Sequence, residues 1–209
     1  MFVITADQVD SRTTADLIGA ESKRINTAHA GTLALPADRI AGDELQALTA
    51  DAATALALAL ELTRTRQFHV GIGIGPVRSP LPESTREATG PAFFAARDAA
   101  TRAKRADTRL AIQCQREPQD DSARAEDAEA LLALLLITRE RRSDAGWELF
   151  DLLTAGHTQA EAAAKLGISA PAASARAKAA NIKAELAALP PLTRLLEQTD
   201  RSTQEETQQ

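Results

Sequence analysis

The chain has 209 residues, of which 44% are hydrophobic and 3% aromatic, and a formal net charge of −5 at pH 7. This length suffices for one or two domains. Much of the hydrophobic share is alanine and aromatic residues are few, so we expect a core of Leu, Ile and Val that lies mostly on helices. The acidic balance argues against a protein that coats nucleic acid or a membrane, but leaves room for a small DNA-binding face. One cysteine, Cys114, excludes a disulfide framework and a CxxC metal site.

The beginning of the chain and its longest apolar run argue against secretion and against a membrane span. Residues 1–12 read MFVITADQVDSR, with an acidic side chain by position 7 and no basic region of a signal peptide. The longest apolar run, residues 130–137, falls short of the roughly 20 residues that a bilayer requires. We therefore expect a cytoplasmic protein without a membrane partner.

The first half of the chain predicts strands that alternate with helices. Apolar or alternating segments indicate strands, and Leu-, Ile- and Ala-rich periodic segments indicate helices. The expected strands are 1–5, 32–40, 68–75 and 109–113, and the expected helices are 14–28, 44–63 and 90–106. The polar, proline-containing stretch 116–122 is the best candidate for a domain boundary.

Residues 68–75 read FHVGIGIG, in which glycine occupies every second position. Val70, Ile72 and Ile74 then share one face of a strand and the other face is bare. A bare face lets a helix or a ligand approach the backbone closely, and the packing of a helix is the simpler explanation. Because Pro76 follows instead of a helix, the segment is not a dinucleotide-binding motif.

The second half of the chain predicts only helices. They are expected at 123–137, 143–155, 158–166 and 170–188, the last one ending at Pro190 and Pro191. The final residues lack an apolar anchor and are expected to be disordered. The predicted domains are an α/β domain over 1–116, a linker over 117–123, a helical domain over 124–197 and a disordered tail over 198–209.

Residues 158–177 read TQAEAAAKLGISAPAASARA and predict two short helices joined by a tight turn. Thr158 and Ser169 stand at the positions of N-terminal caps, and Pro171 falls in the first turn of the second helix. Gly167 suits the left-handed backbone of the turn between them. This arrangement is typical of a helix-turn-helix, whose second helix enters the DNA major groove, although an ordinary helical hairpin is the alternative.

If this segment binds double-stranded DNA, a small set of residues should face bases or phosphates. They are Gln159, Ser169, Ala170, Ser174, Arg176 and Lys178. The basic excess around them is modest, so a single copy should attract phosphate weakly, and a homodimer would present two such helices to half-sites about 34 Å apart. The segment from Trp147 through Lys183 resembles the winged and sigma-region-4-like helix-turn-helix domains of bacterial regulators.

Two aspartates of the first half occupy positions that such a sheet can bring together. Asp7 ends the first strand and Asp43 lies at a Gly-Asp turn after the second. We expect their carboxylates within about 4–6 Å of each other, where they would suit Mg²⁺ or Mn²⁺ holding a phosphate chain. Either aspartate alone is also consistent with a simple turn-forming role.

Four motifs, ITADQVDSR, GDELQAL, VGIGIGPV and GPAFFAAR, follow one another over most of residues 1–105. In this order they resemble the SatD family and, more distantly, the palm fold of class III nucleotidyl cyclases and GGDEF domains. The resemblance implies an α+β fold with a ferredoxin-like, cyclase-like palm domain before an all-α helix-turn-helix domain. It further implies metal ligands at Asp7 and Asp43 and a nucleotide pocket with Gln8, Arg12, Glu44 and Arg97, Arg97 matching an arginine that stabilises the transition state.

The motifs also depart from those of the cyclases. Phe93 stands where the cyclases have an asparagine four residues before the arginine, and the base-selecting Lys and Asp pair has no clear equivalent. Loss of one positioned donor costs about a hundredfold or more in rate. The basic residues of this half could still hold phosphates, or they could simply form a solvated helix face. They are Arg12, Arg97 and the cluster 102–105.

The sequence therefore favours a DNA-binding transcriptional regulator whose first domain senses a nucleotide or metal, or dimerises the chain. One alternative is a divalent-metal-dependent nucleotidyl cyclase-like enzyme that acts on a nucleoside triphosphate. Another is an interaction module whose second-half helices bind a protein.

Overall fold

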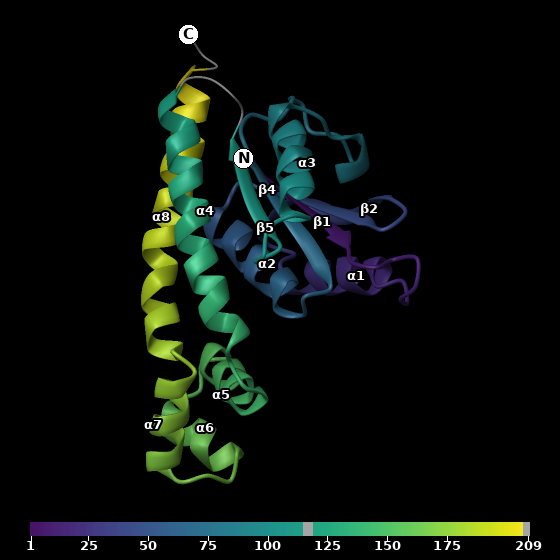
Figure 1. The fold of residues 1–209 in the computed structure, drawn as a ribbon. Coiled ribbons are helices and arrows are strands. Elements are labelled where there is room, and N and C mark those ends of the chain that lie inside the picture. The colour runs from purple at the N-terminus through teal and green to yellow at the C-terminus, as the bar shows by residue number, and fades with distance from the viewer. Residues whose placement is uncertain (115–118, 207–209) are drawn as a thin grey trace. The chain divides into compact units, whose positions relative to one another are not determined.

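The computed structural model describes residues 1–114 and 119–206, which form helices and a single sheet (Figure 1). The predicted α+β class is confirmed. The chain divides into two compact units, Met1–Ala133 with Leu192–Gln209, and Leu134–Pro191. Among the described residues, no helix is both long enough and apolar enough to cross a membrane.

The first unit is built on a five-stranded sheet with the order β2-β3-β1-β4-β5. The strands are β1 (Phe2–Gln8), β2 (Leu33–Ala41), β3 (Glu44–Thr49), β4 (Phe68–Ile74) and β5 (Leu110–Cys114). All neighbouring strands are antiparallel except β4 and β5, which are parallel. The helices between them are α1 (Ile18–Ala28), α2 (Ala52–Arg64), the 3₁₀ helix η1 (Thr85–Glu87) and α3 (Pro91–Ala103).

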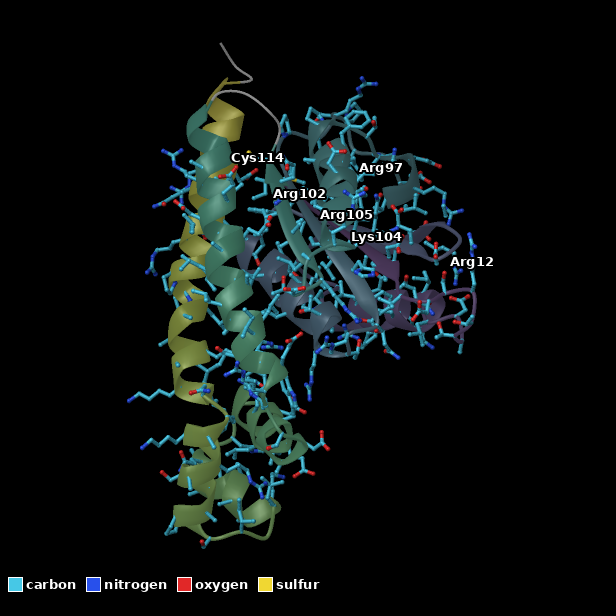
Figure 2. All side chains as sticks on the ribbon, in the orientation of Figure 1. Arg12, Arg97, Arg102, Lys104, Arg105 and Cys114 are labelled. Carbon is cyan, nitrogen blue, oxygen red and sulfur yellow. The ribbon has the colours of Figure 1, made fainter. Side chains whose placement is uncertain are left out.

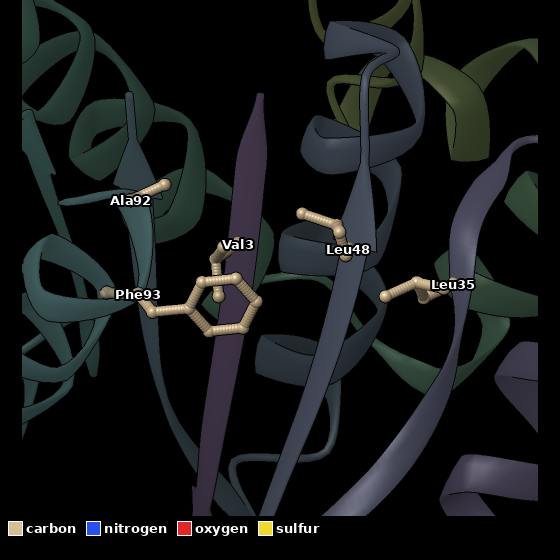
Figure 3. Packing of buried hydrophobic residues seen from close by; sticks show 6 residues of the cluster. Val3, Leu35, Leu48, Ala92 and Phe93 are labelled. Carbon is tan, nitrogen blue, oxygen red and sulfur yellow. The ribbon is translucent and has the colours of Figure 1, made fainter. Parts of the chain in front are cut away.

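Helix α3 packs on the bare glycine face of β4, which confirms the helix expected there. A Cβ atom built on Gly71 would lie 2.3 Å from the Ala100 nitrogen, and one on Gly73 would lie 2.1 Å from the Ala92 oxygen. Only glycine therefore lets the helix backbone approach so closely. On the same side of the sheet Phe93 of α3 is buried against Val3, as Figure 3 shows.

The segment 44–63, expected to be one helix, is a strand followed by a helix. Residues Glu44–Thr49 form β3, which pairs with β1 on one side and β2 on the other. The high helix propensity of this segment is overridden because five of its six residues are buried in the middle of the sheet. Helix α2 begins only after Asp51, whose carboxylate accepts a hydrogen bond from the Thr54 N–H at 2.8 Å.

The remaining elements are all helical: α4 (Gln119–Glu140), α5 (Asp144–Thr154), α6 (Gln159–Lys165), α7 (Ala170–Ala179) and α8 (Ile182–Glu206). The predicted linker 117–123 is helical from Gln119 onward, and residues 117–118 lie outside the described residues. The expected helix 170–188 is divided at Asn181, which has a φ of 53°.

The C-terminal segment also differs from its prediction. Helix α8 continues through Pro190 and Pro191, where a stop was expected, and through most of the predicted disordered tail 198–209. Residues 207–209 lie outside the described part of the chain. The tail is ordered into a helix because it does have buried positions, Thr199 and Asp200, which are polar and gave no apolar signal in the sequence.

Candidate functional site

The end of β1 carries Asp7 between two other polar residues at the same level of the sheet. Asp7 pairs with Glu44 of β3 on one side and with His69 of β4 on the other. Cross-strand partners share a face of the sheet, so all three point to the side that α3 covers. Lys104, which directly follows α3, places its ammonium nitrogen 2.9 Å from the Asp7 Oδ2 atom.

Asp43 reaches the same region from the turn between β2 and β3. Its backbone carbonyl accepts a hydrogen bond from the Gln8 N–H at 2.9 Å, and its carboxylate accepts one from the Ser11 hydroxyl. The bond from Ser11 lowers the pKa of Asp43, helped by the positive charges of Lys104 and Arg12. Asp43 is therefore ionised at neutral pH and already hydrogen-bonded.

Glu44 completes the group of acidic side chains that we call the carboxylate cluster (Asp7, Asp43 and Glu44). Burial raises the pKa of Glu44, the nearby charge of Arg97 opposes this, and the charges of Asp7 and Asp43 add to it. The two aspartates therefore lie close enough to act on the same glutamate. The expected 4–6 Å between their carboxylates stays a prediction.

Two carboxylates of the cluster already have partners within the protein, and a metal ion at this place stays a prediction. The carboxylate of Asp7 is engaged by Lys104 and that of Asp43 by Ser11. In residues 1–114 and 119–206, no three or more His, Cys, Asp or Glu side chains gather in a way that could hold a metal ion. The bonds from Lys104 and Ser11 each engage the Oδ2 atom of an aspartate.

The basic residues expected to hold phosphate, which Figure 2 labels, are all exposed but differ in their partners. Arg12 and Arg97 are exposed, and both act on the carboxylate cluster through their charge. Arg102 instead pairs with Glu129 at 2.7 Å. Of this group, Arg12 and Arg97 are the exposed cations whose charge acts on the carboxylate cluster, and Arg105 is exposed as well.

Gln8, expected in a nucleotide pocket, is buried and hydrogen-bonded to the loop that follows β1. Its side chain is 3% exposed, donates to the Ala15 carbonyl at 2.7 Å and accepts from the Leu17 N–H at 2.9 Å. These bonds hold the loop that follows β1, which leads into α1. Both ends of the Gln8 amide are thus engaged within the protein, and its part in ligand binding stays a prediction.

We expect no efficient cyclase activity from this arrangement. Phe93 is buried in the core and has no hydrogen-bond donor, while Lys104 holds the first aspartate. Purified protein incubated with ATP or GTP and Mn²⁺ should form no cyclic nucleotide above a no-enzyme control, as measured by chromatography. Robust product that disappears in the Asp43→Ala variant would contradict this expectation.

The predicted helix-turn-helix segment lies in the second unit as two helices joined by a turn. Thr158 and Glu161 form a capping box at the start of α6, and the Ser169 hydroxyl accepts from the Ala172 N–H at 3.3 Å at the start of α7. Gly167 adopts a φ of 65°, the left-handed conformation predicted for it. Leu149 of α5 anchors the small core below these helices.

Helix α7 exposes almost its whole length. Of its residues only Ala173 is buried, while Ala170, Ser174 and Lys178 are exposed. The cap Ser169, and Gln159 at the start of α6, are exposed as well. A helix of an ordinary bundle would bury a full apolar stripe, so this surface is free to contact another molecule.

Arg176, also expected to face DNA, is partly buried. Its guanidinium donates to the Ala145 carbonyl at 3.4 Å and lies 3.6 Å from the Glu148 carboxylate. The side chain is 26% exposed and is directed toward α5. Arg176 therefore belongs to the contact between α5 and α7, and Lys178 is the exposed cation of α7.

A buried ionic group beside the same helices has no recognisable signal in the sequence. Glu185 is buried between Arg139 and Arg142 and forms an ion pair with each. The Arg142 guanidinium carbon lies 4.3 Å from the centre of the Trp147 ring. In the sequence Glu185 reads as one more surface charge, since its arginine partners precede it by more than 40 positions.

Comparison of the chain with models of known protein families, with curated proteins and with solved structures finds no match. The function must therefore be inferred from the two sites themselves.

Proposed function

We propose that this protein is a DNA-binding transcriptional regulator whose helices α6 and α7 contact the duplex. The observation that carries the proposal is the exposure of α7, which buries only Ala173 although it is capped and held by a defined core. Its first residues, the part of a second helix that meets base edges, are Ala170 and Pro171. Their apolar surfaces suit the methyl group of thymine.

Phosphate contacts would come from the lysines near this surface. Lys165, Lys178 and Lys183 are exposed, whereas Glu185 is buried against two arginines. Because Arg176 is directed away from this surface and Glu161 stays exposed, the basic excess of the surface is no larger than the sequence indicates. It remains modest for a single copy, which supports a homodimer that presents two such surfaces.

The first unit would then sense a ligand or pair two copies of the chain. Arg12 and Arg97 beside the carboxylate cluster favour an anionic ligand such as a nucleotide, while the engaged Asp7 argues against metal-dependent turnover. We propose a sensing or dimerising role in preference to a cyclase-like enzyme. The resemblance to the SatD family is compatible with this proposal.

A mobility-shift titration tests the DNA-binding proposal. Wild-type protein should shift fragments from its own genomic neighbourhood with a sequence preference, and Ala175→Glu should weaken binding by at least about tenfold because a carboxylate would face phosphates. Lys178→Ala should weaken binding to all sequences equally and reduce the slope of log K against log salt by about 1.

Lys23→Ala is the matched control for Lys178→Ala, because Lys23 is also exposed but lies on α1 of the other unit. It should leave the titration unchanged. Absence of any sequence-preferring shift from the folded protein, with or without added nucleotide, would reject DNA binding and favour a protein partner for α7.

A further inference from the structure

We infer that two copies of this chain pair through an exposed apolar face of α4, with the two helices antiparallel and Leu134 at the centre of the contact. The inference rests on the proposed function, in which a homodimer presents two α7 helices, and it assigns the surface that joins the copies. The longest apolar run of the chain, residues 130–137, lies entirely on α4.

Helix α4 carries apolar side chains on two opposite sides. The residues of its buried side are Ala125, Ala128, Leu132, Leu135 and Leu136. On the other side Leu131 is 51% exposed, Leu134 63% and Ile137 42%. These three are half of the large hydrophobic side chains that are exposed among the described residues. Because exposed apolar residues of a monomeric protein are normally scattered singly, three on one helix face indicate an interaction surface.

Leu134 lies in the middle of this exposed face. At 3.6 residues per turn, Asp127 and Arg141, each seven positions from Leu134, lie within about 20° of the line along the helix through Leu134. Leu131 and Ile137, each three positions away, lie about 60° to either side of that line. Arg141 directly follows α4 and the other four belong to it, so the geometry of this one helix fixes all these positions.

This arrangement favours a second copy of the chain as the partner, because a twofold-symmetric contact uses the same face of both chains. In an antiparallel pair with its axis at Leu134, that residue faces its own copy, and Leu131 of one chain lies level with Ile137 of the other. Asp127 of each chain then meets Arg141 of its partner, at both ends of the contact. A parallel pair would instead place like charges together, which is unfavourable.

Both charged residues are available for such a contact. Asp127 and Arg141 are exposed, and in the part of the chain that the structure describes neither forms an ion pair or a side-chain hydrogen bond. Glu129 of the same helix, in contrast, is engaged by Arg102. The contact extends over only about 21 Å of helix, so we expect a dimer that dissociates in the micromolar range.

Sedimentation velocity of the full chain without DNA tests the inference. The wild type should show a monomer–dimer equilibrium, and Leu134→Glu, which places two carboxylates opposite each other at the axis, should raise its dissociation constant at least about tenfold. Leu81→Glu is the matched control, since Leu81 is also exposed but lies outside α4, and it should leave the constant unchanged. Circular dichroism establishes that each variant is folded.

A charge exchange tests the antiparallel direction. Asp127→Arg alone and Arg141→Asp alone should each raise the dissociation constant about fivefold, because like charges then meet at both ends, and the double variant should restore it. Equal constants in the wild type and Leu134→Glu would overturn the inference, whether both proteins dimerise or both remain monomers. A double variant as weak as the two single variants would also overturn it.

These measurements separate the inference from DNA binding. A wild type that dimerises through α4 but shifts no DNA would reject the proposed function and leave this contact standing. A wild type that shifts DNA with a sequence preference, but dimerises no better than Leu134→Glu, would overturn the contact alone.

Discussion

Replacement of Glu185 by alanine should lower the free energy of unfolding of the Leu134–Pro191 unit by about 3–5 kcal/mol. Glu185 is 1% exposed, and its carboxylate pairs with the guanidinium groups of Arg139 and Arg142. Both arginines are themselves only 7% exposed. Without the carboxylate, two buried guanidinium groups would lose the counter-charge that Glu185 provides.

The aromatic rings nearby would compensate only in part. The Arg142 guanidinium carbon lies 4.3 Å from the Trp147 ring centre and 4.5 Å from that of Phe150. Each such contact contributes about 0.5–2 kcal/mol, less than the loss of a buried ion pair. The variant should therefore unfold at markedly lower denaturant concentration, and fluorescence of Trp147, the only tryptophan in the chain, reports the transition.

Glu148→Ala is the matched control in the same unit. Glu148 also pairs with an arginine, but its side chain is 61% exposed, so its removal should cost less than about 1 kcal/mol. A triple variant that replaces Arg139 and Arg142 by Met and Glu185 by Leu should be close to the wild type in stability. A loss in Glu185→Ala no larger than that in Glu148→Ala would contradict the burial of the group.

Substitution of Gly73 by alanine should have the second large effect, a loss of about 3 kcal/mol or more in the free energy of unfolding of the first unit. The added methyl would lie 2.1 Å from the Ala92 oxygen and 2.3 Å from the Ala96 nitrogen. Both are backbone atoms of α3, so the whole helix would have to move. Denaturation followed by circular dichroism measures the loss.

Gly19→Ala provides a control with the opposite sign. A Cβ atom at Gly19 meets nothing within 4 Å, and the residue lies within α1. Alanine there should raise the stability by about 0.5–1 kcal/mol, because it lowers the backbone entropy of the unfolded chain. If Gly73→Ala proved as harmless as Gly19→Ala, α3 would not pack on β4 as described.

Several features of the fold could be predicted because they depend on local pattern. The alternating glycines of β4 predicted a strand with a helix on its bare face, and α3 lies there. The caps Thr158 and Ser169 and the turn at Gly167 were predicted from residue type alone. In each case the neighbours in the sequence impose the conformation.

Other features depend on contacts between distant segments, which the pattern does not report. Residues Glu44–Thr49 have helical propensity but pair with strands on both sides. Pro190 lies inside α8, although its missing N–H predicts a helix end.

The candidate sites also combine features that local sequence pattern predicts with features that depend on contacts between distant segments. The sequence indicated that Asp7 and Asp43 approach the same end of β1, since each ends a strand or forms a turn. It could not indicate that Lys104, 97 positions after Asp7, forms an ion pair with it. Likewise the orientation of Arg176 toward Glu148 is set by the packing of α7 on α5.

The ion pair between Arg102 and Glu129 protects one edge of the sheet from pairing with a strand of another molecule. Glu129 accepts from the Ile112 N–H at 2.7 Å, and Arg102 donates to the Ile112 carbonyl at 3.0 Å. Ile112 lies on β5, the outermost strand on its side, where free backbone groups are a template for strand addition and aggregation. An extended segment of another chain would first have to displace both charged side chains before it could lengthen the sheet.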